Sequence, residues 1–308
     1  MAAYLVRRIL WIGPVLFAVA LITFVLMHQV PGGPWDRAKR LPPQALENVN
    51  LQYGLDQPVW EQFGRYLLDL AQGDLGASFR SRNRPVADVL ADGIRVSATL
   101  GLLALAVSVT VGVGLGVVSA LRRNTVLDYA AVAFATVGAS VPSFILGMLL
   151  LVLFTARLHW LPSGGWGSPQ QAVMPVAALS ALPAAYIARV TRASMLDVLQ
   201  QEYVRTARAK GLRERAVVLR HMLRNALIPV LTVIGPVGAM LVTGSFVVEH
   251  LFAIPGIGRT FVNSISARDY GVIMGTTLFY TFVVAVANLV VDALYAVVDP
   301  RIRYEAHG

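Results

Sequence analysis

Long uncharged stretches separate shorter polar segments along the whole chain. Six windows contain no Asp, Glu, Lys or Arg, namely 9–30, 96–121, 129–156, 170–188, 225–248 and 270–291. Each is close to or longer than the roughly 20 apolar residues that a helix needs to cross a bilayer. The fourth is the shortest and holds Pro175 and Pro183, which membrane helices tolerate when neighbours satisfy the freed carbonyl groups. The pattern predicts an all-α membrane protein with six transmembrane helices.

The segment 31–95 lies between the first two windows and carries eight basic and eight acidic residues. Within it, apolar residues recur at helical spacing and predict an amphipathic helix over 59–71. These residues are Val59, Phe63, Tyr66, Leu67 and Leu70. We expect the segment to be an extracytoplasmic insert that caps the outer helix ends. It is also a candidate landing surface for a soluble binding protein.

Arginine dominates the short loops on one side of the predicted helices. The basic residues there are Arg7 and Arg8, Arg122 and Arg123, nine Lys and Arg residues within 189–224, and Arg301 and Arg303. Positively charged loops stay in the cytoplasm, so both termini should be cytoplasmic. The first window, at 22 residues, is too long for the apolar core of a signal peptide, so we expect a retained first helix in the cell membrane.

Composition agrees with this class, since 56% of the residues are hydrophobic and only 14% are charged. Soluble domains carry about 25% charged residues. The formal net charge of +9 follows from the cytoplasmic loops. A nucleic-acid-binding function is disfavoured, because no aromatic residues interleave the basic cluster on a soluble fold.

The residues 202–212 form a basic, helix-forming segment between two windows. Gly211 is a natural residue for the left-handed position that ends a helix. Ala207 and Gly211 have small or no side chains and are four residues apart, so we expect one face of the helix to let a groove on another protein approach the backbone closely. The flanking arginines can form ion pairs with carboxylates of that protein. The alternative is an ordinary basic loop bound to lipid phosphates.

Motifs for catalysis, nucleotide binding and metal binding are missing. The two lysines, Lys39 and Lys210, precede Arg40 and Gly211, so the chain has no G-K-[ST] phosphate loop. The five histidines form no H-E-x-x-H pair, and there is no cysteine. We therefore expect no catalytic, cofactor-binding or metal-binding residue in this chain.

Several residues inside or beside the windows are candidates for a pathway or a gate. Ser140, Pro142 and Ser143 predict a kink that either lines a cavity or is relieved by packing. Pro255 and Gly256 follow Glu249 and predict a re-entrant or gate loop, with a plain outer rim as the alternative. The close glycines at 112 and 116 indicate tight helix packing.

Asp292 is the one carboxylate near the end of the last window, one turn after Asn288. A carboxylate within a membrane helix is a functional candidate by default. Because it lies near the cytoplasmic end, we expect it to form a structural ion pair with Arg122 or Arg123.

Several stretches carry a family resemblance through their order and spacing. They are Tyr4-Leu5-Val6-Arg7-Arg8, Pro31-Gly32-Gly33-Pro34, Gly54-Leu55-Asp56-Gln57-Pro58, Gly73-Asp74-Leu75-Gly76, Ser140-Val141-Pro142-Ser143-Phe144, the run 203–212, Arg224-Asn225-Ala226, Pro255-Gly256-Ile257-Gly258 and Asp299-Pro300-Arg301-Ile302-Arg303. The chain resembles permease subunits of the dipeptide/oligopeptide/nickel family of binding-protein-dependent ABC importers nearly end to end. Gly33 stands where that family usually has Asp.

The resemblance implies a cytoplasmic coupling helix with an E-A-A-x3-G signature. Gly211 fits the glycine, and strict spacing then puts Arg205, Thr206 and Ala207 at E-A-A, so the acidic residue is absent there. Glu202 lies three positions earlier. The residues that the resemblance implies for coupling to an ATPase are Glu202, Arg205, Thr206, Ala207, Ala209, Lys210 and Gly211.

The resemblance further implies a second, homologous permease subunit, two ATP-binding subunits that use ATP and Mg, and an extracytoplasmic binding protein that delivers peptides. It divides the chain into 1–30, the insert 31–95, a five-helix permease core over 96–303 with a coupling loop at about 189–224, and a tail, 304–308. Import of nickel or another small solute is the alternative. A self-sufficient secondary transporter or channel is disfavoured, because no midplane ionisable residue or inverted repeat is visible.

Overall fold

The computed structural model describes residues 2–30, 44, 47, 50, 51, 54–81 and 84–298, with side chains for those between 6 and 290. Regular structure in these residues is helical, apart from one isolated bridge between Ala77 and Pro85, which confirms the all-α class. Five of the described helices are long and apolar enough to cross a membrane, or six if one bent pair counts as a span. The motifs at 31–34 and 299–303 lie outside the described residues.

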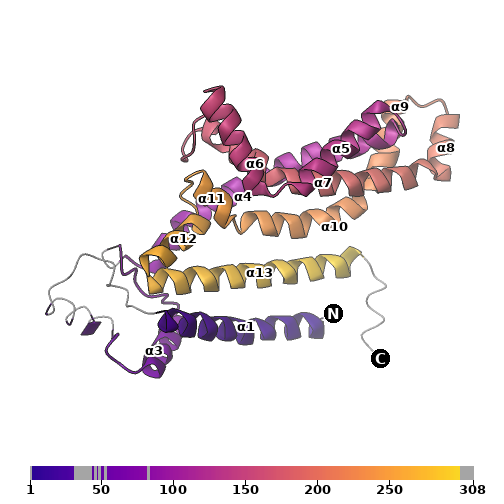
Figure 1. Cartoon of the computed structure of the whole chain (residues 1–308). Coiled ribbons are helices and arrows are strands. Elements are labelled where there is room, and N and C mark those ends of the chain that lie inside the picture. The colour runs from indigo at the N-terminus through magenta and orange to yellow at the C-terminus, as the bar shows by residue number, and fades with distance from the viewer. Residues whose placement is uncertain are drawn as a thin grey trace. The chain divides into compact units, whose positions relative to one another are not determined.

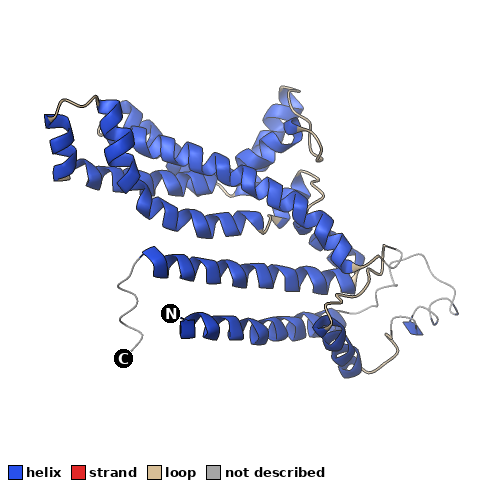
Figure 2. Cartoon of the chain, turned by 180° about the vertical axis from the view of Figure 1, so that it is seen from behind, coloured by secondary structure: helices blue, strands red, loops and turns tan. Residues whose placement is uncertain are grey.

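The helices follow the predicted windows closely, though not at every boundary (Figures 1 and 2). They are α1 (Ala2–Gln29), α3 (Val59–Ala71), α4 (Val86–Leu121), α5 (Val126–Ser140), α6 (Ser143–Leu150), η1 (Leu151–Arg157), α7 (Pro169–Leu199), α8 (Glu202–Ala209), α9 (Glu214–Ala216), η2 (Val217–Met222), α10 (Leu223–Val242), α11 (Phe246–Leu251), α12 (Ile257–Ala267) and α13 (Tyr270–Val298). The η segments are π-helical.

The chain forms two compact units. The first comprises Met1–Ser97 and Pro255–Leu289, and the second comprises Ala98–Ile254 and Val290–Gly308. The first unit is built on α1 and α13, whose buried residues form one apolar cluster. Its members are Ala20, Phe24, Met27, Ile273, Met274 and Leu278. The expected amphipathic helix is present as α3, and it packs Phe63, Tyr66 and Leu70 against this cluster.

In the second unit, α7 is packed against α5, α6 and α10. The glycines of α4 let that helix approach α7 closely. A Cβ at Gly112 would lie 2.8 Å from the carbonyl oxygen of Ala184, and one at Gly116 would lie 2.5 Å from Cβ of Thr191. These positions confirm that the two glycines serve close helix packing.

The third window is not a straight helix. It is broken into α5 and the continuous run of α6 and η1, and the two parts meet at an angle of 104°. Val141 has an extended backbone, with ψ 120°, because the residue before a proline is disfavoured in the helical region. Pro142 then begins the next helix. The sequence predicts a kink at this position, and the structure has a sharper change of direction there.

Further boundaries differ from the predicted windows. Helix α4 begins at Val86, so residues 86–95, expected in the insert, are part of that helix. The helical run of the fifth window begins at Glu214 and ends at Val242, because Gly244 adopts φ +89° and Ser245 caps a separate helix, α11. The fourth helix continues to Leu199. Residues 189–199, expected at the start of the coupling loop, are therefore part of α7.

Candidate functional site

The predicted coupling segment is a short helix, α8, joined by a turn to α9 (Figure 1). Lys210 ends the helix, and Gly211 follows with φ +74°. The left-handed conformation expected for Gly211 is therefore confirmed. Among the described residues, no heavy atom beyond the adjacent residues lies within 4 Å of a Cβ built at this glycine. The turn thus needs glycine for its backbone conformation and not for lack of space.

One face of α8 is buried against the chain itself. Val204 is 0% exposed and Ala207 is 5% exposed. They belong to an apolar cluster that we call the loop core, which comprises Ala120, Met195, Val198, Val204, Ala207, Val217, Val218, Met222 and Ala226. The expectation that Ala207 and Gly211 share an open, low face is wrong. Ala207 is small because α8 lies against α7 and η2 there.

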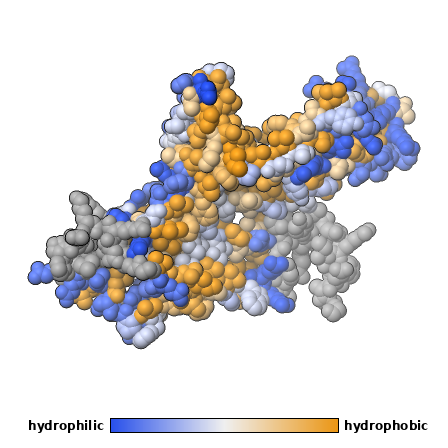
Figure 3. Space-filling model, in the orientation of Figure 1, coloured by the Kyte–Doolittle hydropathy of each residue, from blue (hydrophilic) through white to orange (hydrophobic). Residues whose placement is uncertain are grey.

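The opposite face of α8 is exposed. We call the residues Glu202, Arg205, Thr206 and Ala209, which lie at helical spacing three and four apart, the outward stripe. Arg205 donates to Glu202 at 3.1 Å, and both side chains are largely exposed. Lys210 and Gly211 extend the exposed surface beyond the helix. Figure 3 shows hydrophilic residues gathered at this end of the second unit.

Two polar contacts fix α8 to its neighbours. The guanidinium of Arg208 donates two hydrogen bonds to the carboxylate of Glu214 in α9, at 2.6 and 3.2 Å. The amide of Asn225, in α10, donates to the hydroxyl of Tyr203 at 2.8 Å. These contacts hold α8 to α9 and to α10, so the orientation of the outward stripe is fixed relative to both helices.

Sequence reasoning missed a buried polar cluster close to the loop core. Asp128 of α5 is 2% exposed, and its carboxylate accepts bonds from Nε and Nη2 of Arg192 in α7 at 2.9 and 3.0 Å. It also accepts hydrogen bonds from the Ser119 hydroxyl of α4 and from the backbone N–H of Asn124. We call Ser119, Asp128 and Arg192 the clamp. The feature of the sequence that could have indicated this cluster is Asp128, an acidic residue directly before an uncharged window.

The predicted gate residues lie in both units. In the second unit, Ser140 donates to the carbonyl of Thr136 at 2.8 Å, Pro142 caps α6 and Ser143 is its first residue. In the first unit, Pro255 is exposed and Gly256 is the N-cap of α12. These residues lie at the break between α5 and α6 and at the start of α12. Their part in a pathway or a gate stays a prediction.

The expected pair of Asp292 with Arg122 also stays a prediction. The side chain of Asp292 lies outside the described residues. Arg122 begins the exposed turn after α4, and its carbonyl oxygen accepts a hydrogen bond from the hydroxyl of Thr125.

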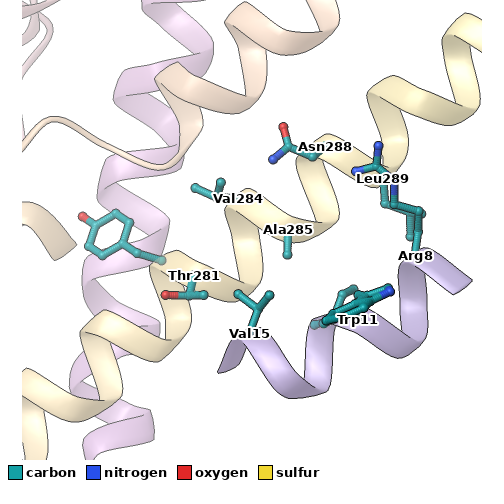
Figure 4. Close-up of a pocket in the computed structure, with 10 residues that line it drawn as sticks. Arg8, Trp11, Val15, Thr281, Val284, Ala285, Asn288 and Leu289 are labelled. Carbon is teal, nitrogen blue, oxygen red and sulfur yellow. The ribbon is translucent and has the colours of Figure 1, made fainter. Parts of the chain in front are cut away.

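A groove of about 460 Å³ lies between α1 and α13 within the first unit (Figure 4). Trp11, Val15 and Val284 contribute apolar walls, and Thr281 and Asn288 contribute polar groups. Across the part of the chain that the structure describes, no three His, Cys, Asp or Glu side chains lie together as a metal site would require. The mainly apolar lining suits contact with lipid or protein.

Comparison with known proteins gives matches over nearly the whole chain. The model described as binding-protein-dependent transport system inner membrane component matches residues 112–304, and the model for the N-terminal part of such components matches residues 1–102. The dipeptide transport system permease protein DppB of Bacillus subtilis is 44% identical over 308 residues, all of both chains. The oligopeptide transport system permease protein OppB of Escherichia coli K12 is 42% identical over 306 residues, 99% of this chain and all of the relative.

Two solved structures share the fold. The chain resembles an inward-facing structure of the MetNI methionine ABC transporter with a TM-score of 0.55 and 19% identity, over 68% of this chain and 96% of the other. An amino acid ABC transporter crystallised with histidines matches with a TM-score of 0.51 and 16% identity, over 70% of this chain and 94% of the other. At these identities, the likeness concerns the fold alone.

Proposed function

This chain belongs to the family of binding-protein-dependent transport system inner membrane components, and we propose that it is the permease subunit of an ABC importer for peptides. The observation that carries the proposal is the match along the full length to a dipeptide permease at 44% identity. As a member of this family with several apolar helices, the chain is a multi-pass inner membrane protein.

The proposed orientation follows from the charged segments. Both termini and α8 lie in the cytoplasm, since Arg7, Arg8 and the basic residues around α8 mark that side. The segment 31–95 is the extracytoplasmic insert. The residues 96–303 form the permease core, which contains the coupling segment.

ATP and Mg bind to separate subunits in this proposal, because the chain lacks a phosphate loop. Two ATP-binding subunits drive transport, a second homologous permease completes the pathway, and an extracytoplasmic binding protein delivers the peptide. Glu202, Arg205, Thr206 and Ala209 of the outward stripe, with Lys210 and Gly211, form the surface that meets an ATP-binding subunit. Their exposure and the bracing of α8 support this role. Ala207 supports the surface from beneath.

Reconstitution tests the proposal. In liposomes, the purified chain alone should neither hydrolyse ATP nor accumulate a dipeptide. Uptake should begin only when the second permease, the ATP-binding subunits and the binding protein are all present. Hydrolysis by the isolated chain would contradict the proposal, and uptake of a nickel chelate in place of dipeptide by the full complex would change the substrate.

A further inference from the structure

We propose that Asp128 and Arg192 are a positioning pair that transmits movement of the α8 segment to the bend between α5 and α6. The inference rests on the proposed function, because it requires an ATP-driven partner at α8. It assigns a role to the clamp, a buried polar cluster that the proposed docking surface and the predicted gate residues leave unexplained.

The first step is the connection between α8 and α7. Val204 and Ala207 of α8 pack with Met195 and Val198 of α7 in the loop core. Only two residues separate the end of α7 at Leu199 from the start of α8 at Glu202. Since interiors are close-packed, a displacement of α8 displaces the last turns of α7 as well.

The second step is the interface between α7 and α5, which is made of small residues. Ala135 of α5 packs against Ala185 and Ala188 of α7. A Cβ at Gly138 would lie 3.3 Å from the carbonyl oxygen of Ala181. Small side chains do not interdigitate deeply, so this interface permits sliding of one helix along the other, as in shear motions.

The clamp removes that freedom at one end of the interface. The Arg192 guanidinium binds both carboxylate oxygens of Asp128, at 2.9 and 3.0 Å, and a two-pronged contact of this kind fixes direction as well as distance. Nε of Arg192 also donates to the hydroxyl of Ser119, at 2.9 Å. The start of α5, the end of α4 and α7 are therefore tied at a single point.

The third step leads from α5 to α6. These helices meet at the 104° break before Pro142. On α6, a Cβ at Gly147 would lie 2.9 Å from Leu251 and 3.1 Å from Phe252, so α6 is closely packed against α11 and the buried residue after it. A shift of α5 that is imposed through Asp128 thus reaches the bend and the residues packed on α6.

The test measures dipeptide uptake and ATP hydrolysis in the same vesicles, with the complete complex. For Arg192→Gln we expect less assembled complex, because the buried Asp128 carboxylate loses its charged partner. Each assembled complex should hydrolyse ATP at close to the unmodified rate but transport about tenfold fewer peptides per ATP, within the usual range of coupling between sites. Arg192→Lys keeps the charge but loses the two-pronged contact, so its ratio should fall less. Arg189→Gln, on the exposed side of α7, is the matched control and should leave the ratio unchanged.

Two results would overturn the positioning role. The first is a ratio of transported peptides to hydrolysed ATP that is unchanged in Arg192→Gln. The second is a fall of uptake and hydrolysis together, in proportion to the loss of assembled complex. If Arg192→Gln does not assemble, Ser119→Ala replaces it in the test, because this variant retains the ion pair between Asp128 and Arg192. An unchanged ratio of peptides to ATP in Ser119→Ala also counts against the proposal. A lowered ratio supports it. Failure of the proposed function is distinct, because the unmodified complex would then show no ATP-dependent peptide uptake.

Discussion

Arg208 at the end of α8 and Glu214 at the start of α9 are joined by two hydrogen bonds, at 2.6 and 3.2 Å, across the turn that contains Gly211. The pair closes the turn, while φ +74° at Gly211 reverses the chain. Exposed ion pairs typically contribute less than about 1 kcal/mol, so the glycine sets the turn and the pair restrains it.

Gly211→Val is the first prediction. A side chain in the left-handed region costs roughly 1–2 kcal/mol, and no neighbour in the described part of the chain lies within 4 Å of the added Cβ. We expect the variant to insert in the membrane but to lose uptake, because strain and bulk are added where a partner docks. Uptake and co-purification of the ATP-binding subunits measure the effect.

Gly73→Val is the matched control for this prediction. Gly73 has φ +83°, and no described heavy atom beyond its chain neighbours lies within 4 Å of a built Cβ, but it follows α3 in the first unit, whereas Gly211 belongs to the second. It should bear similar strain and still co-purify with the ATP-binding subunits. Full uptake by Gly211→Val would show that the turn does not couple the ATP-binding subunits to transport.

The second prediction separates the two faces of α8. Ala207→Glu places a carboxylate in the loop core, and burial of an unpaired polar group costs at least about 1–3 kcal/mol, so the yield of folded chain should fall. Ala209→Glu changes the exposed outward stripe, so the chain should fold normally while the ATP-binding subunits are lost. Thermal stability of the purified chain and co-purification give the comparison. Equal stability of the two variants would contradict the packing of Ala207.

The sequence predicts elements well where one local pattern decides them. Val59, Phe63, Tyr66 and Leu70 recur with the helical period, and α3 has the predicted bounds. Gly211 follows a helix-forming run, and its positive φ agrees with that position. The six windows give the apolar helices because length and lack of charge suffice to define them.

Features that depend on distant segments were not predictable. Asp128 and Arg192 are 64 residues apart, and the continuation of α7 to Leu199 is what brings Arg192 to α5. Likewise, which face of α8 is buried depends on η2, which follows α8 in the chain and packs against Val204 and Ala207. Val204 and Ala207 are three apart among polar residues, which marks one apolar face of α8, but the segment 202–212 alone does not show which elements cover that face.

A third prediction tests the orientation. The chain has no cysteine, so single substitutions report one position each. Arg213 and Gln72 are both exposed. Arg213→Cys should react with an impermeant thiol reagent only from the cytoplasmic side, and Gln72→Cys only from outside, because basic loops stay in the cytoplasm. The reverse labelling pattern would place α8 where no cytoplasmic ATPase can reach it.

The fourth prediction uses two glycines of α4 that differ in surroundings. A Cβ at Gly116 would lie 2.5 Å from Cβ of Thr191 and 2.7 Å from the carbonyl oxygen of Ala188, whereas one at Gly114 meets nothing within 4 Å. Gly116→Ala should therefore force α4 away from α7, and overpacking of this kind typically costs about 1–3 kcal/mol. Gly114→Ala should be neutral or slightly stabilising, because alanine is the better helix former.

Thermal unfolding of the two purified glycine variants in detergent measures this difference, and uptake by the complete complex shows its functional consequence. Since the Ser119 contact to Arg192 lies one turn after Gly116, separation of α4 from α7 should also weaken the clamp. Gly116→Ala should then lower the number of peptides moved per ATP in the fraction that still assembles, while Gly114→Ala leaves it unchanged. If both variants unfold at the temperature of the unmodified chain, α4 does not approach α7 as closely as the structure shows.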